Sequence, residues 1–181
     1  MVTDLQKYLR NKQLLSKLNE RGYSLVEMVV VVVIMAILFS VGFGNYRSYQ
    51  KRQYIEGAVR MLKADLRLAQ ENALAGRKPL EPPGNSCLTN SLNGYVFRLE
   101  TNATYAIYAR CAGIDILIKG IESLPSGILV NPWPLVGGND ILFQILGKGV
   151  NRSTDVTINL TWPAGGVSNK QVIVTKGGEI K

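Results

Sequence analysis

The chain has 181 residues, of which 46% are hydrophobic, and a formal net charge of +8 without any histidine. This length allows one globular core beside a separate anchoring segment. Because histidine is the commonest general base and a frequent metal ligand, its absence weighs against hydrolytic triads and zinc sites.

A basic leader precedes an apolar run that contains a single acid. Residues 1–22 hold five basic and two acidic side chains, which favours keeping this segment in the cytoplasm. The run from Leu25 to Phe43 would be about 28 Å long as a helix, close to the bilayer core of about 30 Å. Its only charge is Glu27. An ionisable group in a membrane segment is costly, so Glu27 is a candidate functional residue.

Two simpler explanations remain open for this segment. Ser40-Val41-Gly42 could be a signal-peptidase site, although a secretory signal normally has a shorter apolar region without an acid. The segment could also be a plain single-pass anchor. For Glu27 itself, the simpler explanation is that it caps the helix start, where the macrodipole favours a negative charge, and this is compatible with a functional role.

The residues Gly22-Tyr23-Ser24-Leu25-Val26-Glu27, followed by the apolar helix, resemble the leader and helix start of type IV pilins and their relatives. The resemblance implies that a prepilin peptidase cuts after Gly22 and methylates the new amine of Tyr23, where Phe is the usual residue. It also implies that Glu27 pairs with the amine of a neighbouring pilin and sets the axial register of a filament, because a buried charge tolerates few positions.

The sequence predicts that residues 23–44 form a transmembrane or filament-core helix and residues 45–76 an amphipathic one. Gly76 and Pro79 mark its end. Gly42 and Gly44 each cost about 1 kcal/mol in a helix, which favours a bend or local melting. One apolar stripe recurs at steps of three and four: Ile55, Ala58, Val59, Leu62, Leu66, Ala69 and Ala73.

Residues 77–181 are expected to form an exported β-rich domain. A loop rich in Pro, Gly, Ser and Asn covers residues 79–93, and short turns between the later segments indicate antiparallel sheets. The fold class is therefore α+β, with a long N-terminal helix packed on antiparallel β-sheets. The expected strands are residues 95–100, 104–110, 114–121, 128–130, 141–146, 155–162 and 171–175, with a short segment at 179–181.

Two further stretches resemble the GspH/FimT group of minor pilins and pseudopilins. They are Leu66 to Ala73 followed by Gly76-Arg77, and the tail from Ile141-Leu142-Phe143 to Gly177-Gly178-Glu179-Ile180. The resemblance implies a structural subunit of a type IV pilus or type II secretion filament. Such a chain would cross the inner membrane once, with its C-terminal domain exported, before it assembles with other pilins.

The two cysteines lie after the membrane segment, in a compartment that can be oxidising. A bridge between Cys87 and Cys111 would close a loop of about 25 residues and contribute roughly 3–4 kcal/mol. The alternative is two unpaired thiols. Two thiols without histidine do not complete a metal shell, so no metal or cofactor is expected.

No catalytic constellation is visible, and the chain is not expected to be an enzyme. The charge leaves one alternative function open. Without its leader the chain would carry about +5, which could attract DNA, and some relatives of the family it resembles take part in DNA uptake. The candidate nucleic-acid-binding residues are Arg152, Lys170, Lys176 and Lys181. Scattered lysines are more often a solvated face, and a structural role is preferred.

Overall fold

The computed structural model describes residues 22–80, 86–165 and 168–181, without the side chains of residues 41–45 and Ser86. The chain divides into two compact units, Met1–Asn45 and Tyr46–Lys181. Residues 1–21, which make up nearly all of the expected leader, lie outside the described residues.

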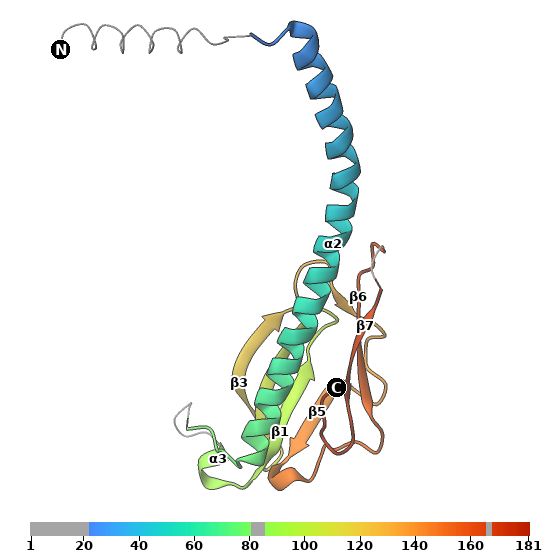
Figure 1. Cartoon of the computed structure of the whole chain (residues 1–181). Coiled ribbons are helices and arrows are strands. Elements are labelled where there is room, and N and C mark those ends of the chain that lie inside the picture. The colour runs from blue at the N-terminus through green and yellow to red at the C-terminus, as the bar shows by residue number, and fades with distance from the viewer. Residues whose placement is uncertain (1–21, 81–85, 166–167) are drawn as a thin grey trace, which may run out of the picture. The chain divides into compact units, whose positions relative to one another are not determined.

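One helix, α2, occupies Leu25–Leu74 (Figure 1). Its backbone remains helical through Gly42 and Gly44, so the local melting favoured by the sequence does not occur. Over the described residues, no helix is sufficiently long and apolar to cross a membrane. The crossing expected for residues 23–44 is not confirmed.

The C-terminus of α2 is closed by a glycine. The amide of Gly76 donates to the carbonyl of Ala73 at 3.1 Å, and that of Arg77 donates to the carbonyl of Asn72 at 3.1 Å. Gly76 has φ = +58°, the left-handed conformation that this pair of hydrogen bonds needs. The predicted stop at Gly76 is therefore correct.

The second unit contains a four-stranded antiparallel sheet in the order β3-β2-β1-β5. Its strands are β1 Leu92–Leu99, β2 Thr104–Cys111, β3 Ile114–Ser123 and β5 Asp140–Gln144. The C-terminal half of α2 lies along one face of this sheet (Figure 1). The α+β prediction is confirmed.

A smaller antiparallel sheet has the order β4-β6-β7, with β4 Leu129–Val130, β6 Val156–Thr161 and β7 Lys170–Val174. Along β6 buried and more exposed residues alternate, as the sequence predicts for a strand with one wet face. Val174 forms an isolated antiparallel bridge with Ile180, in the expected terminal segment.

The sequence misplaced two local elements. The loop expected over residues 79–93 contains a short helix, α3 Ser86–Thr89, and gives way to β1 at Leu92. The strand expected to reach Leu146 ends at Gln144, and a 3₁₀ turn, η1 Ile145–Gly147, follows. Leu146 has φ = +59°, so its backbone leaves the extended conformation there.

The core lies between α2 and the two sheets. Every member of the predicted helix stripe is at most 1% exposed except Val59, which is half-buried. Phe97 and Tyr105 stack beneath the helix with ring centroids 4.9 Å apart. One charged residue, Asp65, is buried among the described side chains at 7% exposure.

Candidate processing and assembly site

The start of α2 is set by Ser24. Its Oγ accepts a hydrogen bond from the backbone amide of Glu27 at 3.2 Å, and its carbonyl accepts one from the amide of Met28 at 3.2 Å. The Ser-x-x-Glu spacing is that of a capping box, in which a serine satisfies amides that the first helical turn leaves free. Ser24, rather than Glu27, therefore provides the observed cap.

The bond between Gly22 and Tyr23 lies outside this helix. Residues 22–24 have no helical or strand assignment, and Tyr23 is 74% exposed. A Cβ placed on Gly22 would meet nothing within 4 Å, so the fold of this chain does not explain the glycine. An exposed, non-helical peptide bond next to a fixed helix start is sterically open to a peptidase.

The first half of α2 is apolar on every side. Large hydrophobic residues from Leu25 to Phe39 are between 42% and 80% exposed. A helix that is hydrophobic all round normally lies inside protein or lipid. We therefore expect lipid or another protein surface to cover these side chains.

Glu27 stands in the first turn of this apolar helix and is exposed. Within the part of the chain that the structure describes, it takes part in no salt bridge. Its position near the helix N-terminus is favourable for a carboxylate. The acid is thus available to a cation from another molecule.

An aromatic face, which was not predicted from the sequence, lies on α2 at the start of the second unit. Tyr46, Tyr49 and Tyr54 are 54–59% exposed, and with Gln50 and Gln53 they line a shallow hollow of about 310 Å³. At 100° per residue Tyr46, Tyr49 and the two glutamines lie on the side of the helix opposite the buried stripe, and Tyr54 lies at the flank between them. The spacing of the tyrosines was the signal that could have revealed this face.

Gly57 belongs to the same face. It is an exposed residue inside the helix, without a positive φ, and a Cβ there would have no neighbour within 4 Å. A glycine in a helix costs about 1 kcal/mol relative to alanine, yet no contact among the described residues requires one here. Another backbone approaching the helix closely would explain it.

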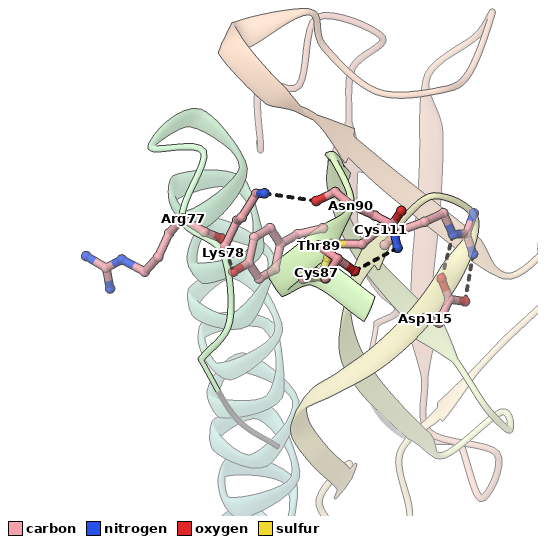
Figure 2. The surroundings of a disulfide bond; sticks show 9 residues. Arg77, Lys78, Cys87, Thr89, Asn90, Cys111 and Asp115 are labelled. Carbon is pink, nitrogen blue, oxygen red and sulfur yellow. Dashed lines mark hydrogen bonds and ion pairs between the residues drawn. A yellow bond between two sulfur atoms is a disulfide. The ribbon is translucent and has the colours of Figure 1, made fainter. Parts of the chain in front are cut away.

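Cys87 of α3 and Cys111 at the end of β2 form a disulfide, with Cα atoms 5.1 Å apart (Figure 2). Two hydrogen bonds hold the same region. Lys78 Nζ donates to the carbonyl of Asn90 at 2.9 Å, and the Tyr95 hydroxyl donates to the carbonyl of Arg77 at 2.7 Å. The disulfide to β2 and the hydroxyl of Tyr95 in β1 therefore attach the segment after α2 to the sheet at two points, and Lys78 joins two parts of the segment itself.

The four candidate DNA-binding residues do not form one free basic surface. Arg152 donates to the backbone carbonyls of Val136, Gly138 and Asp140. Lys170 lies 3.8 Å from Glu56, and Lys181 lies 3.2 Å from Glu179.

Lys176 is separated from Lys170 by the length of β7. Lys170 is the first residue of that strand and Lys176 follows its end, so about 20 Å of extended chain separates them. Charges that far apart act almost independently at physiological salt.

Within the described residues, no cluster of three or more His, Cys, Asp or Glu side chains could hold a metal ion.

The segment around the exposed Gly22–Tyr23 bond and the apolar start of α2 also matches a known protein family. Residues 17–43 match the family model described as the prokaryotic N-terminal methylation motif. No curated protein matches the chain in sequence.

The chain is similar in structure to the type IV minor pilin FimU of Pseudomonas aeruginosa strain PAO1. In one crystal form the TM-score is 0.53 at 12% identity, covering 74% of this chain and 90% of FimU. In a second crystal form the TM-score is 0.49 at 12% identity, covering 70% of this chain and 90% of FimU. At this identity the first likeness concerns the fold, which is type IV pilin-like.

Proposed function

We propose that this type IV pilin-like chain is a minor pilin or pseudopilin, a structural subunit of a type IV pilus or type II secretion filament. The observation that carries the proposal is the methylation motif on a capped helix whose large apolar side chains from Leu25 to Phe39 are exposed. Such a helix is costly for an isolated chain and becomes favourable when neighbouring subunits cover it, at roughly 25 cal/mol per Å² of apolar surface.

Processing is the first step. A prepilin peptidase would cut between Gly22 and Tyr23, outside the helix that Ser24 caps, and the amine of Tyr23 would be methylated. The cut would remove the basic leader and leave the α-amine of Tyr23 as a new N-terminus beside the apolar helix. Methylation leaves that amine cationic.

Assembly would then use Glu27. Its carboxylate has no cation of its own in the described chain, and the amine of Tyr23 in a neighbouring subunit would supply one. A charge pair surrounded by apolar side chains is stable at few relative positions of the two helices. Glu27 would therefore fix the axial register.

The aromatic face of α2 would be a second contact between subunits. We assign it to α2 of a neighbouring subunit, because it follows along the same helix from the apolar segment and contains Gly57, which permits close approach. Tyrosine is enriched at protein interfaces because it combines a large rigid apolar surface with a hydroxyl. Tyr46 and Tyr49 precede Gly57 on α2 by about three and two turns and would contact the partner helix there.

Before assembly the same apolar residues would hold the chain in the inner membrane by a single segment, with the C-terminal domain exported. Extraction of the membrane fraction with alkaline carbonate would test this. We expect the processed chain to remain in the pellet, and release into the supernatant would contradict membrane anchoring.

The processing step is tested in cells that contain an active prepilin peptidase. Mass spectrometry of the wild-type chain should find an N-terminus at methylated Tyr23. Gly22→Leu should block the cut, because a branched side chain replaces hydrogen next to the scissile bond. Gly57→Leu, a control outside the motif, should be processed normally. An uncut wild-type chain would refute the step.

The assembly step is tested with Glu27→Ala. We expect normal membrane insertion and processing, and at least a tenfold loss of crosslinking into filaments, because the neighbouring amine loses its partner. Glu71→Ala removes an exposed acid from the same helix and should assemble normally. Equal incorporation of both variants would eliminate the register role.

A DNA-uptake subunit is the alternative, and the dispersed lysines do not favour it. Duplex DNA binding by wild type and by a Lys170, Lys176 and Lys181 to Gln variant, each over a salt series, separates the two functions. A structural subunit should show no binding at physiological salt. Micromolar binding that the triple variant abolishes would favour DNA uptake instead.

A further inference from the structure

A polar hollow lies on the face of the larger sheet that is turned away from α2. It has a volume of about 310 Å³. Two arginines and two asparagines contribute to its walls, together with a glycine turn. The lining residues are Arg110, Gly137, Gly138, Asn139, Asp140, Asn151 and Arg152.

The two asparagines present hydrogen-bond donors. Oδ1 of Asn139 accepts from the amide of Leu135 at 3.0 Å, and Oδ1 of Asn151 accepts from the amide of Leu142 at 3.1 Å. Since backbone amides only donate, these bonds fix which side-chain atom is the oxygen. Each Nδ2 group is left without a partner among the described residues.

The side-chain acceptors of the hollow, and two of its backbone carbonyls, already accept hydrogen bonds. Arg152 Nη2 donates to the carbonyls of Gly138 and Asp140 at 2.7 and 2.6 Å. The carboxylate of Asp140 accepts from Arg98 and Arg110. Among the side chains of the hollow, a ligand would therefore meet free donors rather than free acceptors.

The net charge of the residues around the hollow is positive, which favours the same kind of ligand as the free donors. Arg98 and Arg110 are balanced by Asp115 and Asp140 in one cluster. Arg152 has only neutral carbonyl partners in the described chain. The hollow thus has one uncompensated positive charge.

The wall is also fixed in place. Gly137 has φ = +84°, and a Cβ there would collide with Nη1 of Arg152. Three carbonyls hold that guanidinium, so the loop and the arginine support each other. A preformed arrangement of donors loses little entropy when it binds a ligand.

We infer that this hollow binds a small monocarboxylate, such as a sugar acid, through the Nδ2 groups of Asn139 and Asn151 and the charge of Arg152. Arginine and amide donors match the paired oxygens of a carboxylate. The volume suits a ligand the size of a monosaccharide. This site is independent of filament assembly, so either proposal can fail without the other.

Isothermal titration of the full chain in detergent tests the site with D-galacturonate, D-galactose and acetate as probes. We expect millimolar binding of galacturonate that weakens with salt, and no binding of galactose, which lacks the carboxylate. Binding of acetate as well would identify a general carboxylate site, whereas galacturonate alone would identify a sugar acid. No binding of either acid, or equal binding of galactose, would overturn the inference.

Asn151→Asp is the most specific variant. Aspartate keeps the oxygen that accepts from Leu142 and replaces the Nδ2 donor by a negative oxygen, so the melting temperature should stay near that of wild type while galacturonate affinity falls at least tenfold. Asn139→Asp, which keeps the oxygen that accepts from Leu135, should have the same effects on melting temperature and galacturonate affinity. Asn169→Asp makes the same charge change on an exposed residue before β7 and should bind normally. Unchanged affinity in both wall variants would refute the site.

Discussion

At the residue scale, the buried carboxylate of Asp65 joins α2 to the sheet. The hydroxyl of Tyr105 donates to Oδ2 at 2.6 Å, and Lys119 Nζ lies 2.8 Å from both carboxylate oxygens. Burial, followed by the hydrogen bond to Asp65, raises the pKa of Tyr105. The bond to Asp65 also raises the pKa of Lys119. A buried acid is tolerated here because both oxygens are satisfied.

Tyr105→Phe should lower the free energy of unfolding by about 1–2 kcal/mol, because Asp65 loses a buried donor. Tyr108→Phe is the matched control. Its hydroxyl donates to Glu100 at 2.8 Å on a half-exposed part of the sheet, and its loss should cost a few tenths of a kcal/mol. Urea unfolding of the three proteins measures the difference, and equal effects would contradict a special role for the buried pair.

At the element scale, one glycine within α2 and one just after it have opposite roles. Gly57 is helical and exposed, whereas Gly76 adopts φ = +58° beyond the last turn. Gly57→Ala should raise the free energy of unfolding by about 0.5–1 kcal/mol, and Gly76→Ala should lower it by about 1 kcal/mol. Thermal unfolding checks both signs. A destabilising Gly57→Ala would mean that this chain itself requires the glycine.

The disulfide should stabilise the segment that follows α2. Replacing Cys87 and Cys111 together by Ser opens a loop with a sequence separation of 24 residues and should cost about 3 kcal/mol. Unfolding of the oxidised wild type, the reduced wild type and the double variant measures this. Identical stability of the oxidised and reduced wild type would show that the hydrogen bonds of Lys78 and Tyr95 suffice.

At the scale of the whole molecule, one ionic cluster connects all four strands of the larger sheet. Arg98 of β1 and Arg110 of β2 contact Asp115 of β3 and Asp140 of β5 at 2.6–3.1 Å. Hydrogen bonds from Arg110 and Arg98 lower the pKa of Asp115, and those from Arg98 and Arg110 lower the pKa of Asp140. The cluster holds together strands that are distant in sequence.

These lowered pKa values predict acid sensitivity. The stabilisation is complete above the unfolded carboxyl pKa of about 3.9 and is lost as the pH falls below it through the folded values. The free energy of unfolding should therefore decrease below about pH 4. Asp115→Asn should flatten this decrease, and Glu71→Gln should leave its slope unchanged. A slope in Asp115→Asn equal to that of wild type would remove the cluster as its cause.

The sequence by itself determined the elements whose causes are local. The buried stripe of α2, the stop at Gly76 and the strands with alternating burial each follow from residue spacing or from a glycine. The pilin-like N-terminus could also be predicted, because Gly22, Ser24 and Glu27 lie within six residues of one another.

Tertiary structure decided the rest. Arg98, Arg110, Asp115 and Asp140 come together only because four strands pair in the order β3-β2-β1-β5. Arg152 was expected to bind DNA, but its guanidinium holds the loop at Gly137, because β5 and the segment after it bring Arg152 back beside that loop. Side-chain partners that are distant in the chain depend on strand order and register, and residue spacing does not specify either.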